Sequence, residues 1–275
     1  MAYENFKPTM WAATIDRNLH QKSILVDWCN QKVKGQPNYG NKLEILGNGT
    51  VNIFDYDTET GLGAPETPEG GVTHLLIDQQ KAFNFKVDDI DNAQTTPDLM
   101  PALMDEATEK LASARDLYVA EVGAGSSQIS AALTIATPVE AKAAIDKALK
   151  VLRKNNVAPG MSVRIELAYW MYQLFRDYLV EAKTANDELI KNGTIGMYDG
   201  CQVAFTNNLK NDGTNDYMMV RTNKAIAFAG RTSKVEPYRP QNFFADAVKG
   251  LNVFGAVIAR PKEIYVIKAK DGTEA

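Results

Sequence analysis

The residues of this chain whose types and spacing could support chemistry include a group of carboxylates near residue 60. Asp55, Asp57 and Glu59 alternate with other residues and Glu66 follows, a spacing that loosely matches an oxygen-rich calcium-binding loop. Such a loop needs glycine at its sharp turn, whereas Thr60 occupies this position and the glycine comes one residue late. Acidic runs without that geometry are usually solvated. The pattern therefore favours a solvated acidic segment over a calcium site, and no metal site is predicted.

Other reactive side chains lack the neighbours that catalysis requires. The stretch that starts at Gly123 has the glycine content of a phosphate-binding loop, but it lacks the GK(S/T) ending and follows a predicted helix. His20 and His74 have no HxH or HExxH context, and Cys29 and Cys201 form no CxxC pair. The sequence contains no GxSxG or SxxK motif. We therefore predict no enzyme activity and no cofactor, with an α+β enzyme whose site is assembled from distant residues as the alternative.

The composition limits the class of protein. The chain has 275 residues with 45% hydrophobic content, which suffices for one large domain or two small ones. Charged residues make up 23% of it, so general disorder is not expected. The net charge of -4 argues against free nucleic-acid binding by the whole subunit. No apolar run reaches the ~18 residues of a membrane span and the start is no signal peptide, so we expect a soluble protein without a membrane partner.

Charge is distributed unevenly along the chain. Residues 1–42 hold six bases and three acids, whereas residues 43–91 hold ten acids and only two lysines, a net charge of -8. Within this acidic segment, residues 50–55 and 82–88 alternate polar and apolar side chains and are predicted to be strands. The sequence between them is rich in Gly, Pro, Thr and Glu, which is typical of a loop. We predict a two-stranded ribbon, which is marginally stable alone and needs support, in part from another subunit.

The ribbon carries the side chains that we expect to contact a neighbouring subunit. Its acidic groups are expected to dock onto basic side chains next door, where many weak pairs together set register and selectivity. Its second strand presents aromatic side chains on one face. The predicted inter-subunit contact residues are Asp57, Glu59, Glu66, Glu69, Phe83 and Phe85.

The remaining predicted elements give a mixed α+β order. Apolar residues recur at three- and four-residue spacing over about residues 98–121, which predicts a long helix. Thr137 and Glu140 form a capping box around Pro138, which predicts the start of a second helix. A strand is predicted at 162–167 and a helix at about 168–191, without a regular βαβ alternation. Shorter strands are predicted at 202–205, 217–221, 225–229, 252–258 and 263–267.

Longer motifs occur in both halves of the chain. Residues 196–209 read GMYDGCQVAFTNNL, residues 223–229 read NKAIAFA, and residues 244–261 read FADAVKGLNVFGAVIARP. Residues 5–11 read NFKPTMW, and residues 76–89 read LIDQQKAFNFKVDD. Taken in their order along the chain, these stretches resemble the major capsid proteins of tailed bacteriophages. Encapsulins and herpesvirus capsid floors share the capsid fold of this family. The resemblance spans nearly the whole chain and is therefore fairly specific, although no single motif would be.

The resemblance implies an α+β capsid fold and a structural role. The family assembles into hexamers and pentamers that close an icosahedral shell around double-stranded DNA. The implied parts are an N-terminal arm at 1–42, an extended β-hairpin loop at 43–91, a peripheral domain with a spine helix at 92–155, an axial domain at 156–245, and a return to the peripheral domain at 246–275. A shell of the encapsulin type that holds protein cargo is the close alternative.

The resemblance also implies partners and a location. The arm-like motif starts at Asn5, so we expect a separate scaffolding protein rather than an encoded scaffolding segment. A portal protein, an optional decoration protein and DNA bound non-specifically on the inner face complete the expected partners. Some relatives cross-link a lysine near the loop tip to an asparagine next door, but residues 57–72 contain no lysine. The expected product is a non-covalent capsid, assembled in the host cytoplasm and present in the virion.

Overall fold

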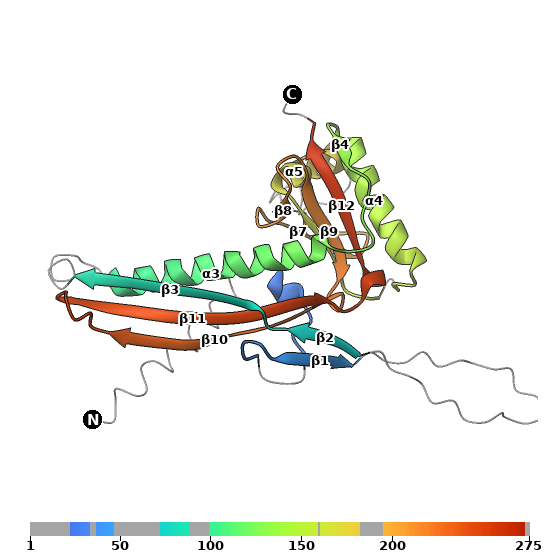
Figure 1. The fold of residues 1–275 in the computed structure, drawn as a ribbon. Coiled ribbons are helices and arrows are strands. Elements are labelled where there is room, and N and C mark those ends of the chain that lie inside the picture. Colours follow the sequence, from blue (N-terminus) through green and yellow to red (C-terminus); the bar gives the residue numbers. More distant parts are fainter. Residues whose placement is uncertain are drawn as a thin grey trace, which may run out of the picture.

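The computed structural model describes most of the chain. The described residues are 23–33, 37–46, 72–88, 99–158, 160–181 and 195–272. They form an elongated spine with a globular domain at one end of it and a short two-stranded ribbon beside it (Figure 1). The fold is mixed α+β, as predicted from the sequence.

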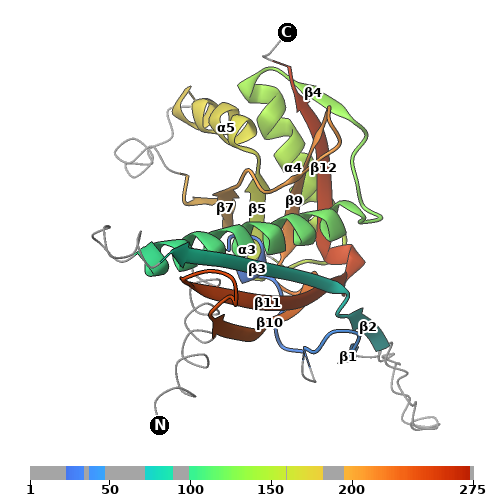
Figure 2. The same ribbon diagram turned by 60° about the vertical axis from the view of Figure 1, so that its left-hand side comes forward.

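The spine is one long helix on a three-stranded antiparallel sheet (Figures 1 and 2). Helix α3 (Leu99–Ala124) lies along a sheet with the strand order β10 (Ile226–Tyr238), β11 (Ala245–Ile258) and β3 (Gln79–Asp88). The 26 residues of α3 make it about 39 Å long at ~1.5 Å per residue. The long helix predicted at 98–121 is confirmed, and it extends three residues farther.

Apolar side chains hold α3 against one face of this sheet. Leu111 and Ala112 of the helix are buried against Val235 and Val248 of the sheet, and Phe83, Phe85 and Met104 pack around them. Because side chains alternate along a strand, their neighbours point away from the helix. We call this opposite surface of the sheet, which includes Ala82, Asn84, Lys234, Glu236, Lys249 and Leu251, the helix-free face.

The ribbon covers the part of the helix-free face that is nearest the globular domain (Figure 1). Strand β1 (Lys42–Leu46) pairs antiparallel with β2 (Val72–Leu76). Leu43 and Leu75 are buried in a small core that also contains Val253 of β11. The ribbon therefore rests on the spine at its base.

The prediction that residues 82–88 form the second strand of the ribbon is wrong. These residues lie in β3, which pairs with β11 and places Phe83 opposite Gly250. Alternation of polar and apolar residues identifies a strand but not its partner, and here the apolar face packs against α3. The other predicted strand, at 50–55, lies outside the described residues. The division of the chain into arm, loop and domains stays a prediction.

The globular domain is built on a mixed sheet flanked by two helices. Its strands, in spatial order, are β4 (Leu133–Ile135), β12 (Ile264–Asp271), β9 (Asp216–Thr222), β5 (Val163–Leu167), β7 (Cys201–Phe205) and β6 (Met197–Tyr198), with β8 (Lys210–Asn211) paired to β9. The main core is shared, since it joins buried side chains of this sheet to Val119 and Ala120 of α3 and to Phe254 of β11. The spine and the globular domain are therefore packed together at their junction.

Helices α4 (Pro138–Lys154) and α5 (Tyr169–Glu181) complete the domain. The predicted capping box is present: Thr137 Oγ1 accepts a hydrogen bond from the Glu140 N–H, and the Glu140 carboxylate accepts one from the Thr137 N–H. The predicted end of the second of these helices, near residue 191, lies outside the described residues. Short 3-10 helices occur at η1 (Val26–Trp28) and η2 (Pro261–Glu263).

The strands of the spine are longer than predicted. The predicted strands at 225–229 and 252–258 are only the ends of β10 and β11 that lie near the globular domain. Farther along, the helix-free face of both strands carries charged residues such as Lys249, which obscure the apolar pattern. Among the helices of the described part, none is both long and apolar enough to cross a membrane.

Candidate functional site

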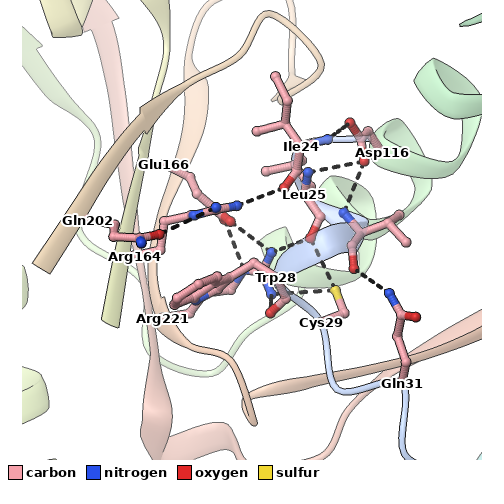
Figure 3. A network of polar contacts seen from close by, with 11 residues as sticks. Ile24, Leu25, Trp28, Cys29, Gln31, Asp116, Arg164, Glu166, Gln202 and Arg221 are labelled. Atoms are coloured by element: carbon pink, nitrogen blue, oxygen red, sulfur yellow. Dashed lines mark hydrogen bonds and ion pairs between the residues drawn. The ribbon is translucent and has the colours of Figure 1, made fainter. Parts of the chain in front are cut away.

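A dense network of polar contacts lies where the N-terminal part of the described chain passes between the spine and the globular domain. We call residues 23–30 the root segment (Figure 3). The Asp116 carboxylate of α3 accepts hydrogen bonds from three consecutive backbone N–H groups, of Ile24 (2.9 Å), Leu25 (3.1 Å) and Val26 (3.0 Å). A side chain of the spine thus holds the start of η1 in the way that a capping residue holds a helix end.

Arg221 of β9 approaches the root segment from the side of the globular domain (Figure 3). Its Nε and Nη2 donate to the two oxygens of Glu166, at 2.9 and 2.8 Å. Nη2 also donates to the Leu25 carbonyl at 2.7 Å, and Nη1 donates to the Trp28 carbonyl at 3.2 Å and to Cys29 Sγ at 3.4 Å. These contacts account for all five N–H donors of a guanidinium group.

Arg164 of β5 supplies a second cationic contact. Its Nη1 donates to the Ile24 carbonyl at 2.9 Å, and its guanidinium lies 4.4 Å from the centre of the Trp28 ring. The root segment continues into the spine, because the Asn30 N–H donates to the Ile226 carbonyl at 2.8 Å and the Asn30 carbonyl accepts from Phe228 at 3.0 Å. The segment therefore contacts α3, β5, β9 and β10.

The electrostatics of the site suit binding within the chain rather than catalysis. Burial raises the pKa of the Cys29 thiol to about 11, so it is not a thiolate at neutral pH. Burial also raises the pKa of Asp116, although the three N–H donors oppose this. Burial alone would lower the pKa of Arg221, but the Glu166 carboxylate more than offsets this, and Arg221 stays charged. The side chains hold one another and the backbone, and they leave no activated nucleophile.

Away from this junction, the helix-free face forms a shallow, basic hollow. A hollow of about 460 Å³ is lined by small and apolar residues such as Ala82 and Leu251 and by charged ones. Lys249 Nζ lies 3.0 Å and Lys234 Nζ 3.4 Å from the Glu236 carboxylate, and these two lysines lower the pKa of Glu236. Two lysines thus flank one carboxylate at this position on the surface.

The turn between β10 and β11 lies at the end of the spine that is farthest from the globular domain (Figure 1), and it carries two exposed aromatic residues. In the turn between β10 and β11, the Phe243 side chain is 55% exposed and that of Phe244 is 84% exposed. Lys86 Nζ lies 3.6 Å from the centre of the Phe243 ring. Two adjacent phenylalanines therefore present apolar surface at this end of the spine.

The structure places the predicted contact residues unevenly. Phe83 and Phe85 stack with their ring centres 5.9 Å apart, and both line a groove of about 370 Å³ between β3 and α3. The predicted acidic contact residues Asp57, Glu59, Glu66 and Glu69 lie outside the described residues. The aromatic pair is therefore located on the spine, and its proximity to the acidic group stays untested.

The sequence reading missed the charged residues at the root segment. Glu166 stands within the apolar strand β5 and Arg221 within the apolar strand β9, and both side chains are fully buried. Charged residues inside otherwise apolar strands are the signal that could have identified them, since buried charges are normally paired. Asp116 gave no comparable signal, because a carboxylate in a long helix usually faces solvent. In the described ranges, no cluster of three or more His, Cys, Asp or Glu side chains could hold a metal ion.

Comparison with known proteins identifies the fold. No protein-family model and no curated protein matches the chain. Among solved structures, a chain of Mycobacterium phage Che8 is similar with a TM-score of 0.74 at 24% identity, over 89% of this chain and 90% of that one. The capsid of cyanophage P-SCSP1u matches with a TM-score of 0.69 at 14% identity, over 91% and 89%. A virus-like particle from Pyrococcus furiosus matches with a TM-score of 0.60 at 11% identity, over 95% and 99%. The predicted tailed-phage capsid fold is confirmed.

Proposed function

We propose that this chain is a major capsid protein, a structural subunit that assembles with its own copies into the hexamers and pentamers of an icosahedral phage head around double-stranded DNA. The observation that carries the proposal is the phage-chain match, which covers 89% of this chain and 90% of the other, so no large part of either fold lacks a counterpart. The exposed aromatic turn at the end of the spine also favours assembly over a monomeric state. The protein would then be part of the virion and would not be an enzyme.

The proposal includes partners beyond further copies of the chain. A separate scaffolding protein would direct assembly, a portal protein would occupy one vertex, and packaged DNA would lie non-specifically against the inner face. A decoration protein is an optional addition on the outside. Because residues 57–72 contain no lysine, neighbouring subunits would be held by packing and charge rather than by a covalent cross-link at this loop.

We propose further that the acidic loop of one subunit docks onto a basic surface of its neighbour. The negative charge of the loop lies on Asp57, Glu59, Glu66 and Glu69. The hollow on the helix-free face that contains Lys234 and Lys249 has the opposite charge and would receive it. Exposed pairs are individually weak, so several of them would act together to fix the register of the contact. Phe83 and Phe85, on the opposite side of the sheet, would make a separate apolar contact at the groove between β3 and α3.

A charge-swap experiment tests the docking. One variant carries Glu59→Lys, Glu66→Lys and Glu69→Lys, a second carries Lys234→Glu and Lys249→Glu, and a third combines all five changes. If the two surfaces meet, the first two variants lose particles in electron micrographs, and the combined variant regains them because opposite charges face each other again. Thermal unfolding of each unassembled variant checks that the fold is unchanged. Normal shells with normal salt tolerance in the first variant would contradict the docking.

A protein-cargo shell is the second candidate function, since the fold also matches the virus-like particle from Pyrococcus furiosus. Analysis of purified particles separates the two functions, because a phage head contains double-stranded DNA whereas a cargo shell contains protein. Size measurement of the purified chain addresses the enzyme alternative. Capsomer rings or megadalton particles support a shell subunit, whereas a stable monomer under all assembly conditions would contradict the proposed function.

A further inference from the structure

The polar groups around the root segment bind mainly its backbone, while Leu25 and Val26 are also buried in the main core. Asp116 binds three consecutive N–H groups, starting at Ile24. Arg164 and Arg221 bind the carbonyl groups of Ile24 and Leu25, respectively. Contacts of this kind fix the path of the chain, because both the donors and the acceptors of successive peptide groups are fixed.

The groups that hold the segment belong to different parts of the molecule. Asp116 lies on the spine helix, whereas Arg164 and Arg221 lie on neighbouring strands of the globular domain (Figure 3). The Asp116 and Arg221 side chains are almost fully buried, with 1% and 0% of their surface exposed. The root segment is thus gripped from two sides at the junction of the spine and the globular domain.

Stability alone does not account for this arrangement. Charged groups lose hydration when they are buried, and a buried ion pair such as that of Glu166 and Arg221 often contributes no more stability than apolar side chains of similar volume. Buried polar contacts do, however, select one geometry, because a displaced donor or acceptor is left without a partner. The charged groups are therefore suited to fix a direction.

A fixed direction matters because of what precedes the root segment. Residues 1–22 continue from Ser23, and an extended chain of that length reaches up to about 75 Å. A root that is fixed in place sets the point from which a segment of this length starts. Precise contacts at the start of such a segment require a rigid root.

We propose that Asp116, together with Arg164 and Arg221, is a positioning clamp that sets the point and the direction at which residues 1–22 leave the body of the subunit. The clamp itself is a property of the single chain. Its consequence, that the N-terminal residues reach a particular surface of a neighbouring subunit, rests on the proposed function.

Hydrogen exchange on the unassembled full-length protein tests the clamp. Asp116→Asn keeps the side-chain size but replaces one acceptor oxygen by an NH2 group, which cannot accept from the root amides. We expect the amides of Ile24, Leu25 and Val26 to exchange at least about tenfold faster, as the loss of charge-assisted hydrogen bonds implies. Amides of β12, which the clamp does not touch, should keep their protection. Asp116→Glu, which retains the charge but displaces it, should give an intermediate result.

Matched variants keep the test decisive. Glu106→Gln removes a carboxylate from an exposed position of the same helix and should leave exchange at the root unchanged. If Asp116→Asn does not fold, Arg164→Gln at a partly exposed position loosens the root segment from its other side, because it removes the donor to the Ile24 carbonyl. Unchanged exchange at residues 24–26 in a folded Asp116→Asn protein would overturn the clamp. Faster exchange in Asp116→Asn would support the clamp even if the wild-type chain formed no shells. The absence of wild-type shells would contradict only the proposed function.

Discussion

At the residue scale, the ion pair of Glu166 and Arg221 shows how a buried charge is accommodated. Both side chains are completely buried, and the closest contact between them is 2.8 Å. The remaining donors of Arg221 bind groups of the root segment, so the pair also links β5 and β9 to residues that come much earlier in the chain. Removal of either partner would leave the other charge in an apolar environment without compensation.

We therefore expect Glu166→Gln to lower the free energy of unfolding by about 3–5 kcal/mol, because it leaves the Arg221 cation buried without its counter-charge. Urea unfolding of the unassembled protein measures this change. Glu236→Gln removes an exposed carboxylate that is also paired with lysine, and it serves as the control with a small expected effect. A similar small effect from both changes would show that the buried pair is not ionised.

Asp212 predicts a pH dependence at an exposed position. It accepts from Lys268 Nζ at 2.9 Å and from the N–H groups of Thr214 and Asn215 at 3.0 and 2.7 Å, which hold the pKa of its carboxyl well below the usual value of 3.8. Above pH 3.8 the carboxylate is ionised in both the folded and the unfolded chain, and its contacts stabilise the fold. Below this pH the unfolded chain takes up a proton first, so that stabilisation is progressively lost.

Asp212→Asn should therefore lower the melting temperature at neutral pH, and the difference from the wild type should shrink as the pH falls below 3.8. Thermal unfolding of both proteins over this pH range measures the difference. Asp177→Asn, at an exposed site whose contact with Arg176 is 3.4 Å long, is the control with a small expected effect. A wild-type advantage that stays constant into strong acid would contradict the role of the ionised carboxylate.

At the element scale, two glycines of the motif at 244–261 occupy positions where any larger side chain would meet neighbouring atoms. At Gly250, an added Cβ would lie 2.3 Å from the Phe83 ring, which covers the glycine. At Gly255, an added Cβ would lie 2.1 Å from the backbone carbonyl oxygen of Leu76, at the end of β2. The first glycine admits an aromatic ring under α3, and the second lets the ribbon lie directly on β11.

Alanine at these two positions should have unequal effects. Gly250→Ala meets a side chain that can move, so Phe83→Leu in the same protein should restore much of the lost stability. Gly255→Ala meets backbone atoms, so it should displace the ribbon and cost more stability, with no single side-chain change that restores it. Denaturant unfolding compares the three variants. Equal costs at the two glycines would show that the ribbon adjusts to the added methyl group.

These elements also show what the sequence can and cannot predict. The long helix and the capped helix were predictable, because apolar spacing and the pair Thr137 and Glu140 are local signals. The partner of β3 was not, because pairing with β11 joins Phe83 to Gly250, far away in the sequence. The clamp was hidden for the same reason, since Asp116 meets a backbone segment about ninety residues earlier. Local patterns identify elements, whereas long-range burial decides their neighbours.

At the scale of the whole molecule, the elongated shape leaves much of the spine uncovered by the other described elements. The globular domain packs on one end of α3, and the ribbon covers only the nearer part of the helix-free face (Figures 1 and 2). The farther part carries the basic hollow and ends in the turn with Phe243 and Phe244. In a shell subunit, these surfaces are the ones available for neighbouring copies.

Phe244 provides the most direct test of this view, because its 84% exposure means that it contributes little to the stability of the single chain. Phe244→Ser should leave the free energy of unfolding nearly unchanged but reduce the yield of particles, since the aromatic area would no longer be buried between subunits. Sedimentation and electron microscopy measure the yield at equal protein concentration. Val139→Ser, at another exposed apolar residue on α4 that is 63% exposed, is the matched control. Full particle yield from Phe244→Ser would mean that the end of the spine stays exposed in the shell.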